Sequence, residues 1–189
     1  NDGTGDFTFS RGSNLAATRV GADGLIEKGR ENLLLQSNQF DTTWLGNVSH
    51  TSGQSGYDGS SDAWLLQNLN TNNYLYQSIS PSGVNTFSVY MKSGNVSWGR
   101  IAIAGGTSFS AWFNLDLGTI GTQTNTIDAK IEAVGNDGWY RCSLTFLANS
   151  NTLALIYPAS SDDHNAPTGS NIYIQDAQLE QGLVATDYI

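Results

Sequence analysis

Apolar and polar residues alternate along most of this chain, and Gly, Asn, Asp and Ser interrupt the alternation at roughly every eight to twelve positions. The clearest example is the stretch 86–92, where apolar residues alternate with Ser88, Tyr90 and Lys92. Such alternation places successive side chains on opposite faces of a β-strand. Helical spacing is nearly absent. The pattern therefore predicts an all-β protein in which about ten strands form an antiparallel two-sheet β-sandwich.

The same pattern predicts how the chain is organised. Residues 1–31 are expected to form an N-terminal lead-in segment that packs on the sandwich, and residues 32–189 to form the sandwich domain. The polar stretch 47–62 is expected to be a long loop. The expected strands are residues 7–11, 32–36, 63–67, 73–79, 86–92, 98–104, 109–117, 127–134, 139–147, 152–157 and 172–174.

Charge and composition narrow the possible partners. The chain has 8 Lys and Arg against 17 Asp and Glu, a net charge of −9, so no basic patch can neutralise a row of phosphates. No apolar run approaches the ~20 residues of a membrane span. We therefore expect neither a nucleic acid nor a membrane as partner. Abundant Gly, Asn, Ser and Thr with little Lys are typical of an extracellular or virion β-protein, and the single Cys142 cannot form an internal disulfide.

Catalytic motifs are not recognisable, so the sequence predicts a protein that is not an enzyme. The 4 glutamates do not pair with an aspartate on one predicted strand face, whereas a glycosidase needs two carboxylates about 5 to 10 Å apart. His50 and His164 lie in expected loops. The run Asp162-Asp-His-Asn165 contains metal-binding residue types, but neighbours on an irregular turn rarely converge on one ion, so a solvated loop is the default interpretation.

Short motifs recur in order along the chain from Phe7 to Ile189. They are Phe9-Ser-Arg11, Ala17-Thr-Arg19, Gly24-Leu-Ile-Glu27, Asn32-Leu-Leu34, Gln39-Phe-Asp41 with Trp44, Phe87-Ser-Val-Tyr-Met-Lys92, Gly138-Trp-Tyr-Arg-Cys142, Ile156-Tyr-Pro-Ala159 and Ala177-Gln-Leu-Glu-Gln-Gly182 with Ala185-Thr-Asp-Tyr-Ile189. Together they resemble a lectin-like (concanavalin A-like) domain of bacteriophage tail and other virion proteins, and the frame is similar to jelly-roll carbohydrate-binding modules. The resemblance implies a jelly roll with a carbohydrate ligand.

The resemblance also implies a structural calcium ion. In such modules calcium often joins the loop after the first core strand to the final strand, and Asp41 and Asp176 occupy the matching places here. Carboxylate oxygens suit this hard cation. The alternative interpretation is that Asp41 caps a turn and Asp176 is a solvated strand end.

Aromatic residues on the polar phase of the strands provide a candidate ligand surface. Sugars stack their apolar C–H faces on aromatic rings while short polar side chains bind the hydroxyls. If the strands concerned share one sheet, these residues form a groove across it; the alternative for each ring is a place in the core or in a subunit contact. The candidate ligand residues are Trp64, Tyr90, Trp98, Arg100, Trp112, Asn114 and Asp116.

The sequence thus predicts a non-catalytic domain that binds a poly- or oligosaccharide by aromatic stacking on one sheet face. Weak single-site affinity would be raised by multivalency in a homo-oligomer or in a larger virion or enzyme polypeptide. The alternative is a structural or attachment domain of a phage tail or fibre protein, without a glycan ligand, whose aromatic residues make subunit contacts. A glycan hydrolase or lyase ranks last.

Overall fold

The computed structural model describes residues 18–20, 24, 26–28, 31–150 and 152–189, and the chain divides into two compact units. The first unit, Asn1–Glu31, contains the antiparallel pair β1 (Thr18–Val20) and β2 (Ile26–Lys28). The strand expected at residues 7–11 lies outside the described residues. That the first unit packs on the sandwich stays a prediction.

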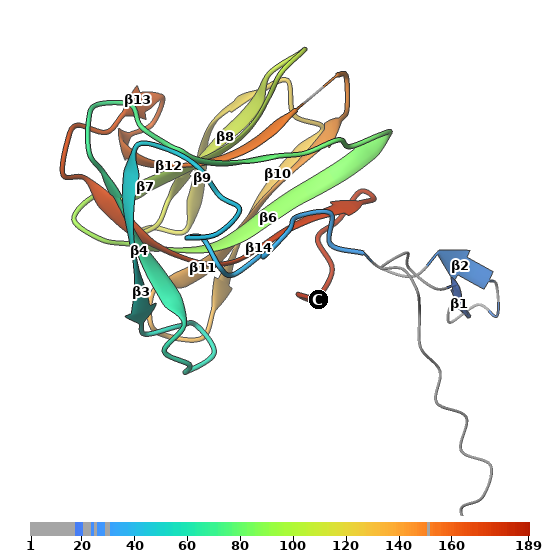
Figure 1. Cartoon of the computed structure of the whole chain (residues 1–189), viewed down its shortest axis with the longest axis horizontal. Helices are drawn as coiled ribbons and strands as arrows, with labels where there is room; N and C mark the ends of the chain where they lie inside the picture. Colours follow the sequence, from blue (N-terminus) through green and yellow to red (C-terminus); the bar gives the residue numbers. More distant parts are fainter. Residues whose placement is uncertain (1–17, 21–23, 25, 29–30, 151) are drawn as a thin grey trace, which may run out of the picture. The chain divides into compact units, whose positions relative to one another are not determined.

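The second unit, Asn32–Ile189, is a sandwich of two antiparallel sheets of six strands each (Figure 1). The described residues contain strands but no helix. The predicted fold class, an antiparallel β-sandwich, is thereby confirmed. One sheet, which we call the β6 sheet, has the order β10 (Asp128–Val134), β11 (Trp139–Leu147), β6 (Val84–Ser93), β14 (Asn171–Gln181), β4 (Ala63–Asn68) and β3 (Val48–Gln54). The other, the β7 sheet, has the order β13 (His164–Asn165), β12 (Leu153–Ser161), β7 (Trp98–Ala104), β8 (Phe109–Asn114) and β9 (Thr119–Thr124), with β5 (Leu75–Ser78) also paired to β12.

Besides β1, β2 and the short β13, two longer strands occur where the sequence predicts none, and one expected strand is missing. β3 lies inside the expected loop 47–62, and β9 lies between two predicted strands. Both are edge strands of polar composition, and an edge strand with one solvated side need not show a clear apolar phase. Residues 32–36, by contrast, form no strand, and residues 34–36 are bends.

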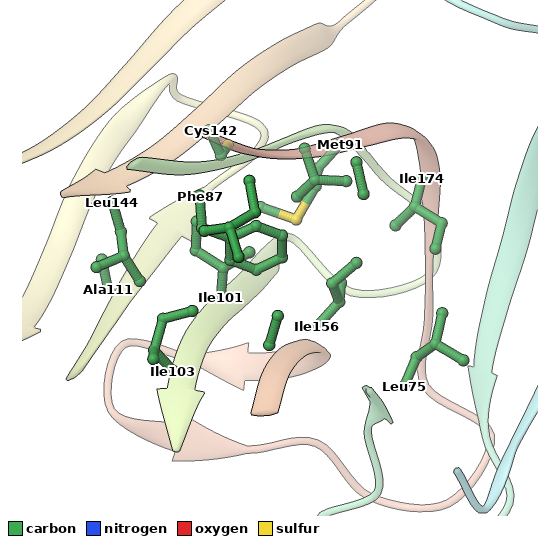
Figure 2. Close-up of a cluster of buried hydrophobic side chains, with 14 of the residues drawn as sticks. Leu75, Phe87, Met91, Ile101, Ile103, Ala111, Cys142, Leu144, Ile156 and Ile174 are labelled. Carbon is green, nitrogen blue, oxygen red and sulfur yellow. The ribbon is translucent and has the colours of Figure 1, made fainter. Parts of the chain in front are cut away.

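The inner faces of the two sheets enclose one hydrophobic core (Figure 2). Phe87 and Met91 of β6, Ile101 of β7, Phe113 of β8 and Leu144 of β11 are fully buried there. Their alternate neighbours along the same strands therefore point away from the core. The strand phase that the sequence indicates for residues 86–92 is the observed one.

Trp64 belongs to this core, which corrects its prediction as a ligand residue. Its ring is 7% exposed and meets Phe40 edge-on, with ring centroids 6.0 Å apart. The Trp64 Nε1–H donates to the carbonyl oxygen of Asn38 at 3.0 Å. The Trp44 ring also packs against Phe40, with ring centroids 5.2 Å apart. Trp64 therefore anchors the segment that enters the sandwich.

A C-terminal segment, residues 182–189, crosses the outer face of the β6 sheet. Hydroxyl groups of the sheet donate to its backbone, from Thr86 to the Gly182 carbonyl oxygen at 3.0 Å and from Thr145 to that of Leu183 at 3.3 Å. The Ile189 N–H donates to Gln178 Oε1 at 3.0 Å. Much of this outer face is therefore not available to a ligand.

Replacing Thr186 by Val is expected to lower the free energy of unfolding by about 1 kcal/mol. The buried Glu180 carboxylate accepts the Thr186 N–H at 2.8 Å and the Thr186 hydroxyl at 2.7 Å, and valine removes the second bond while keeping the shape. Urea denaturation measures the change. Thr119→Val, an exposed position on β9, is the control, and equal stability of both variants would contradict a role for the Thr186 hydroxyl.

Candidate functional site

A row of four side chains crosses the outer face of the β7 sheet. Tyr157 lies directly opposite Arg100, which lies directly opposite Trp112. Residues opposite each other in an antiparallel pair project from the same face, and because Ile101 and Phe113 point into the core, this face is the outer one. Tyr74, just before β5, extends the row. We call Tyr74, Tyr157, Arg100 and Trp112 the aromatic row.

The members of the aromatic row are in contact along its whole length. The Tyr74 and Tyr157 rings lie 5.0 Å apart between centroids. The Arg100 guanidinium lies 4.7 Å from the centre of the Tyr157 ring and 4.2 Å from that of Trp112, distances typical of cation–π contacts. Because Arg100 occupies one face of Trp112, and that indole is only 5% exposed, a sugar cannot stack on the covered face of Trp112.

The accessible rings lie toward β5. Tyr74 and Tyr76 are half-buried and meet edge-on, with centroids 5.9 Å apart. With Gly46, Asn47 and Asn73 they line a hollow of about 270 Å³. Tyr76 lies opposite Leu155, whose other neighbour is the small Ala102. The hollow thus combines two rings with amide groups, which suits a ligand with both apolar faces and hydroxyls.

The opposite end of the row is closed by a turn. Asp162, just after β12, accepts the Thr122 N–H of β9 on Oδ1 at 2.6 Å. A Cβ atom on Gly121 would lie 2.6 Å from Trp98 Cζ3 and closer still to Asp162. β12 and β9 are separated in the sheet by β7 and β8, so this contact bridges the strands beside Trp98. Trp98 is half-buried at this closed end.

Asn114 and Asp116 serve the turn between β8 and β9. Asn114 Oδ1 accepts the N–H groups of Asp116 and Leu117, both at 3.0 Å. The Ser97 hydroxyl donates to the Asp116 carboxylate, and this hydrogen bond, followed by one from Ser93, lowers the pKa of that carboxyl. Both side chains thus have local partners at the edge of the row.

Tyr90 lies on the other sheet, which corrects the prediction of one common groove. β4 and β6 belong to the β6 sheet, whereas β7 and β8 belong to the β7 sheet. The Tyr90 ring is stacked on Tyr57 at 3.8 Å, and the Arg141 guanidinium lies 5.4 Å from its centre. A second hollow of about 270 Å³ on this side is lined by Gln54, Ser55, Lys92 and Tyr173.

The two residues predicted to bind calcium do not share a common surrounding. Asp41 is exposed on a turn. Asp176 is 6% exposed, and its Oδ2 accepts the Tyr57 hydroxyl at 2.9 Å. Burial raises the pKa of Asp176 to about 6, and the other acids that raise it are Asp62 and Asp58 rather than Asp41. In the part of the chain that the structure describes, no three His, Cys, Asp or Glu side chains are gathered for a metal ion. Calcium binding stays a prediction.

Strand phase alone sets Trp112 on an outward phase and Trp98 with Arg100 on one shared phase, and the structure places all three on the outer face of the β7 sheet. Strand phase does not identify Tyr157, the residue that completes the row. The available signal was the phase of β12, where Leu155 and Tyr157 alternate with the core residues Ala154 and Ile156. Four apolar residues in succession hide that alternation in the sequence.

The comparisons with known proteins show a fold. No family model matches the chain, and no curated protein matches it. The xylan-binding CBM22-1 domain of Paenibacillus barcinonensis Xyn10C has a similar structure, with a TM-score of 0.51 and 13% identity over 84% of this chain and 99% of that one. The fold is a jelly-roll β-sandwich. The structure of TmCBM61 in complex with β-1,4-galactotriose has a TM-score of 0.49 at 13% identity, and the match covers 80% of this chain and 99% of that one.

A bacteriophage protein is also among the solved structures that match. Tailspike protein 4 of bacteriophage CBA120 gives a TM-score of 0.45 at 16% identity, and the match covers 81% of this chain but 21% of the tailspike chain. At such identities the similarity concerns the jelly roll and not the ligand. In the described residues no helix is long and apolar enough to cross a membrane.

Proposed function

We propose that this chain is a non-catalytic carbohydrate-binding domain whose ligand lies on the outer face of the β7 sheet. The observation that carries the proposal is the aromatic row together with the hollow beside Tyr74 and Tyr76. A saccharide presents apolar C–H faces and hydroxyl groups, and this surface offers ring edges, an apolar floor at Leu155 and amides at Asn47 and Asn73.

Binding without catalysis fits the chemistry of the surface. The aromatic row contains no carboxylate, and the acids at its closed end, Asp116 and Asp162, are engaged in hydrogen bonds to Ser97 and Thr122. A pair of free carboxylates about 5 to 10 Å apart, as hydrolysis requires, is not part of this arrangement. We expect weak affinity at one site, raised by repetition of the domain in a larger extracellular or virion assembly.

Replacing Tyr74 and Tyr76 together by Ala is expected to weaken glycan binding by about tenfold or more, because each stacked ring contributes roughly 0.5 to 1.5 kcal/mol. The measurement is binding of the full chain to an array of plant, algal and bacterial glycans, followed by titration of the best ligand. Thermal unfolding of each variant shows that it is folded.

Tyr173→Ala is the matched control, because Tyr173 is a half-buried tyrosine beside the hollow of the β6 sheet. Unchanged binding by this variant is expected. Loss of binding in the control instead would move the site to the β6 sheet. An array without any bound glycan would contradict the proposed function and favour a structural virion domain.

A further inference from the structure

Arg100 lies in the aromatic row between two rings and without a carboxylate in contact. The Trp112 and Tyr157 rings flank its guanidinium at 4.2 and 4.7 Å. Its Nε is buried and has no hydrogen-bond acceptor, and the same is true of Trp112 Nε1. Burial lowers the pKa of Arg100, and Tyr157 and then Asp163 oppose this effect only in part. Two neighbouring N–H donors in the row are therefore unsatisfied.

The arrangement leaves the Arg100 guanidinium, which stays charged inside a protein, without a carboxylate partner. A buried donor without an acceptor costs about 1 to 3 kcal/mol. Because Arg100 Nε and Trp112 Nε1 are closed to solvent, a ligand can meet only the remaining nitrogens of the half-buried Arg100. Rings on both faces hold the guanidinium plane and leave its edge as the direction in which it can donate. A carboxylate matches that edge with two parallel hydrogen bonds, whereas the hydroxyl of a neutral sugar brings no charge.

We propose, on the basis of the proposed function, that the groove of the β7 sheet selects an acidic saccharide whose carboxylate binds the Arg100 guanidinium while a neighbouring sugar lies against Tyr74 and Tyr76. The row sets this spacing, since Tyr157 separates Arg100 from Tyr74 by one strand position. Arg100 thereby determines specificity, and the tyrosines supply contact area.

The charge of the whole chain limits which acidic glycan fits. A net charge of −9 repels a polymer that carries a carboxylate on every residue. Asp162 and Asp163, next to the closed end, add to this repulsion locally. The expected ligand is therefore a largely neutral glycan with isolated uronic acid residues rather than a polyuronate.

Titration of the full chain with matched pairs of oligosaccharides tests the inference. Each pair consists of a neutral oligosaccharide and its counterpart with one uronic acid, from the glucose, galactose and mannose series. We expect the acidic member of the preferred pair to bind about tenfold more tightly, as a charged hydrogen-bonded pair allows. Arg100→Gln is expected to abolish that preference while neutral binding persists, and Arg100→Lys to reduce it to about threefold, because Lys lacks the planar fork.

Lys92→Gln, at the cation beside the hollow of the β6 sheet, is the control and should keep the preference. Equal binding of both members of every pair, or a preference that survives in Arg100→Gln, would overturn the inference and make Arg100 a structural support between two rings. If thermal unfolding shows that Arg100→Gln does not fold, the preference is measured in Arg100→Lys instead. A preference that Arg100→Lys keeps undiminished would then overturn the inference. Absence of all binding, neutral and acidic, would instead refute the proposed function itself.

Discussion

Gly46→Ala is expected to lower the free energy of unfolding by about 3 kcal/mol and to weaken glycan binding at the Tyr74 and Tyr76 hollow. Gly46 has a φ of +152°, and a Cβ atom there would lie 2.0 Å from the carbonyl oxygen of Tyr74. No rotation of a side chain can relieve a clash with backbone. Either the turn at Gly46 or the start of β5 must move.

The adjoining backbone makes such a movement unfavourable. Leu45 and Tyr76 exchange two hydrogen bonds, each of 2.8 Å, directly beside Gly46. A shift of β5 breaks these bonds and displaces Tyr74 and Tyr76, which line the hollow together with Gly46. The same substitution should therefore affect stability and ligand binding at once. For a domain of this size the loss corresponds to a melting temperature about 6 to 12 °C lower.

The Gly53→Ala variant is the control, because it introduces backbone strain without a steric clash. Gly53 also has a positive φ, of +82°, but a Cβ atom there would meet nothing within 4 Å. We expect a loss of about 1 kcal/mol from strain alone and no change in glycan binding. Urea denaturation at constant temperature measures both variants. A Gly46→Ala variant no less stable than Gly53→Ala would show that the turn at Gly46 adapts without displacing β5.

Asp176→Asn is expected to stabilise the protein by about 2 kcal/mol at pH 8 and to leave its stability unchanged at pH 4. Asp176 sits where the register of β14 shifts, with a φ of +49°, a conformation that Asn also adopts. Burial, assisted by Asp62 and Asp58, raises the pKa of its carboxyl from 3.8 to about 6. Hydrogen bonds from Tyr57 and Tyr188 oppose the shift but do not cancel it.

The direction of this pKa shift determines how the stability of the protein changes with pH. Between pH 3.8 and about 6 the folded protein holds a proton on Asp176 that the unfolded chain has lost, so stability falls as the pH rises through this interval. Above it, the cost of a buried carboxylate is fully present. An amide of the same shape removes that cost, and the Tyr57 hydroxyl can still donate to its oxygen. Denaturation at several pH values measures the difference between the two proteins.

Calcium binding at Asp176 would give a different result for the Asp176→Asn variant. If Asp176 and Asp41 bound calcium, as the family resemblance implies, calcium would raise the melting temperature of the unmodified protein, and both Asp176→Asn and Asp41→Asn would lose that rise. The surroundings of Asp176 lead us to expect a stabilised Asp176→Asn at pH 8 and an unchanged Asp41→Asn, since Asp41 is exposed. Melting curves with calcium and with a chelator distinguish the two outcomes.

The sequence by itself determined the fold class and the faces of the most regular strands. Residues 86–92 alternate without interruption, so Phe87 and Met91 had to share one face, and both lie in the core. The same reasoning set Trp112 on an outward phase and Trp98 with Arg100 on one shared phase. It was insufficient at residues 63–67, where Leu65 and Leu66 are both apolar and either phase is possible. The core position of Trp64 was for this reason not recoverable from periodicity.

Tertiary structure decided which strands lie side by side. Backbone hydrogen bonds pair β6 with β14 and β11, and β7 with β12 and β8. Backbone groups are the same in every residue, so local alternation does not reveal these partners. The pairing puts Tyr90 on one sheet and Trp98 on the other, and brings Tyr157 from a distant part of the chain against Arg100. Alternation thus determined which way each ring faces, and strand pairing determined which rings meet.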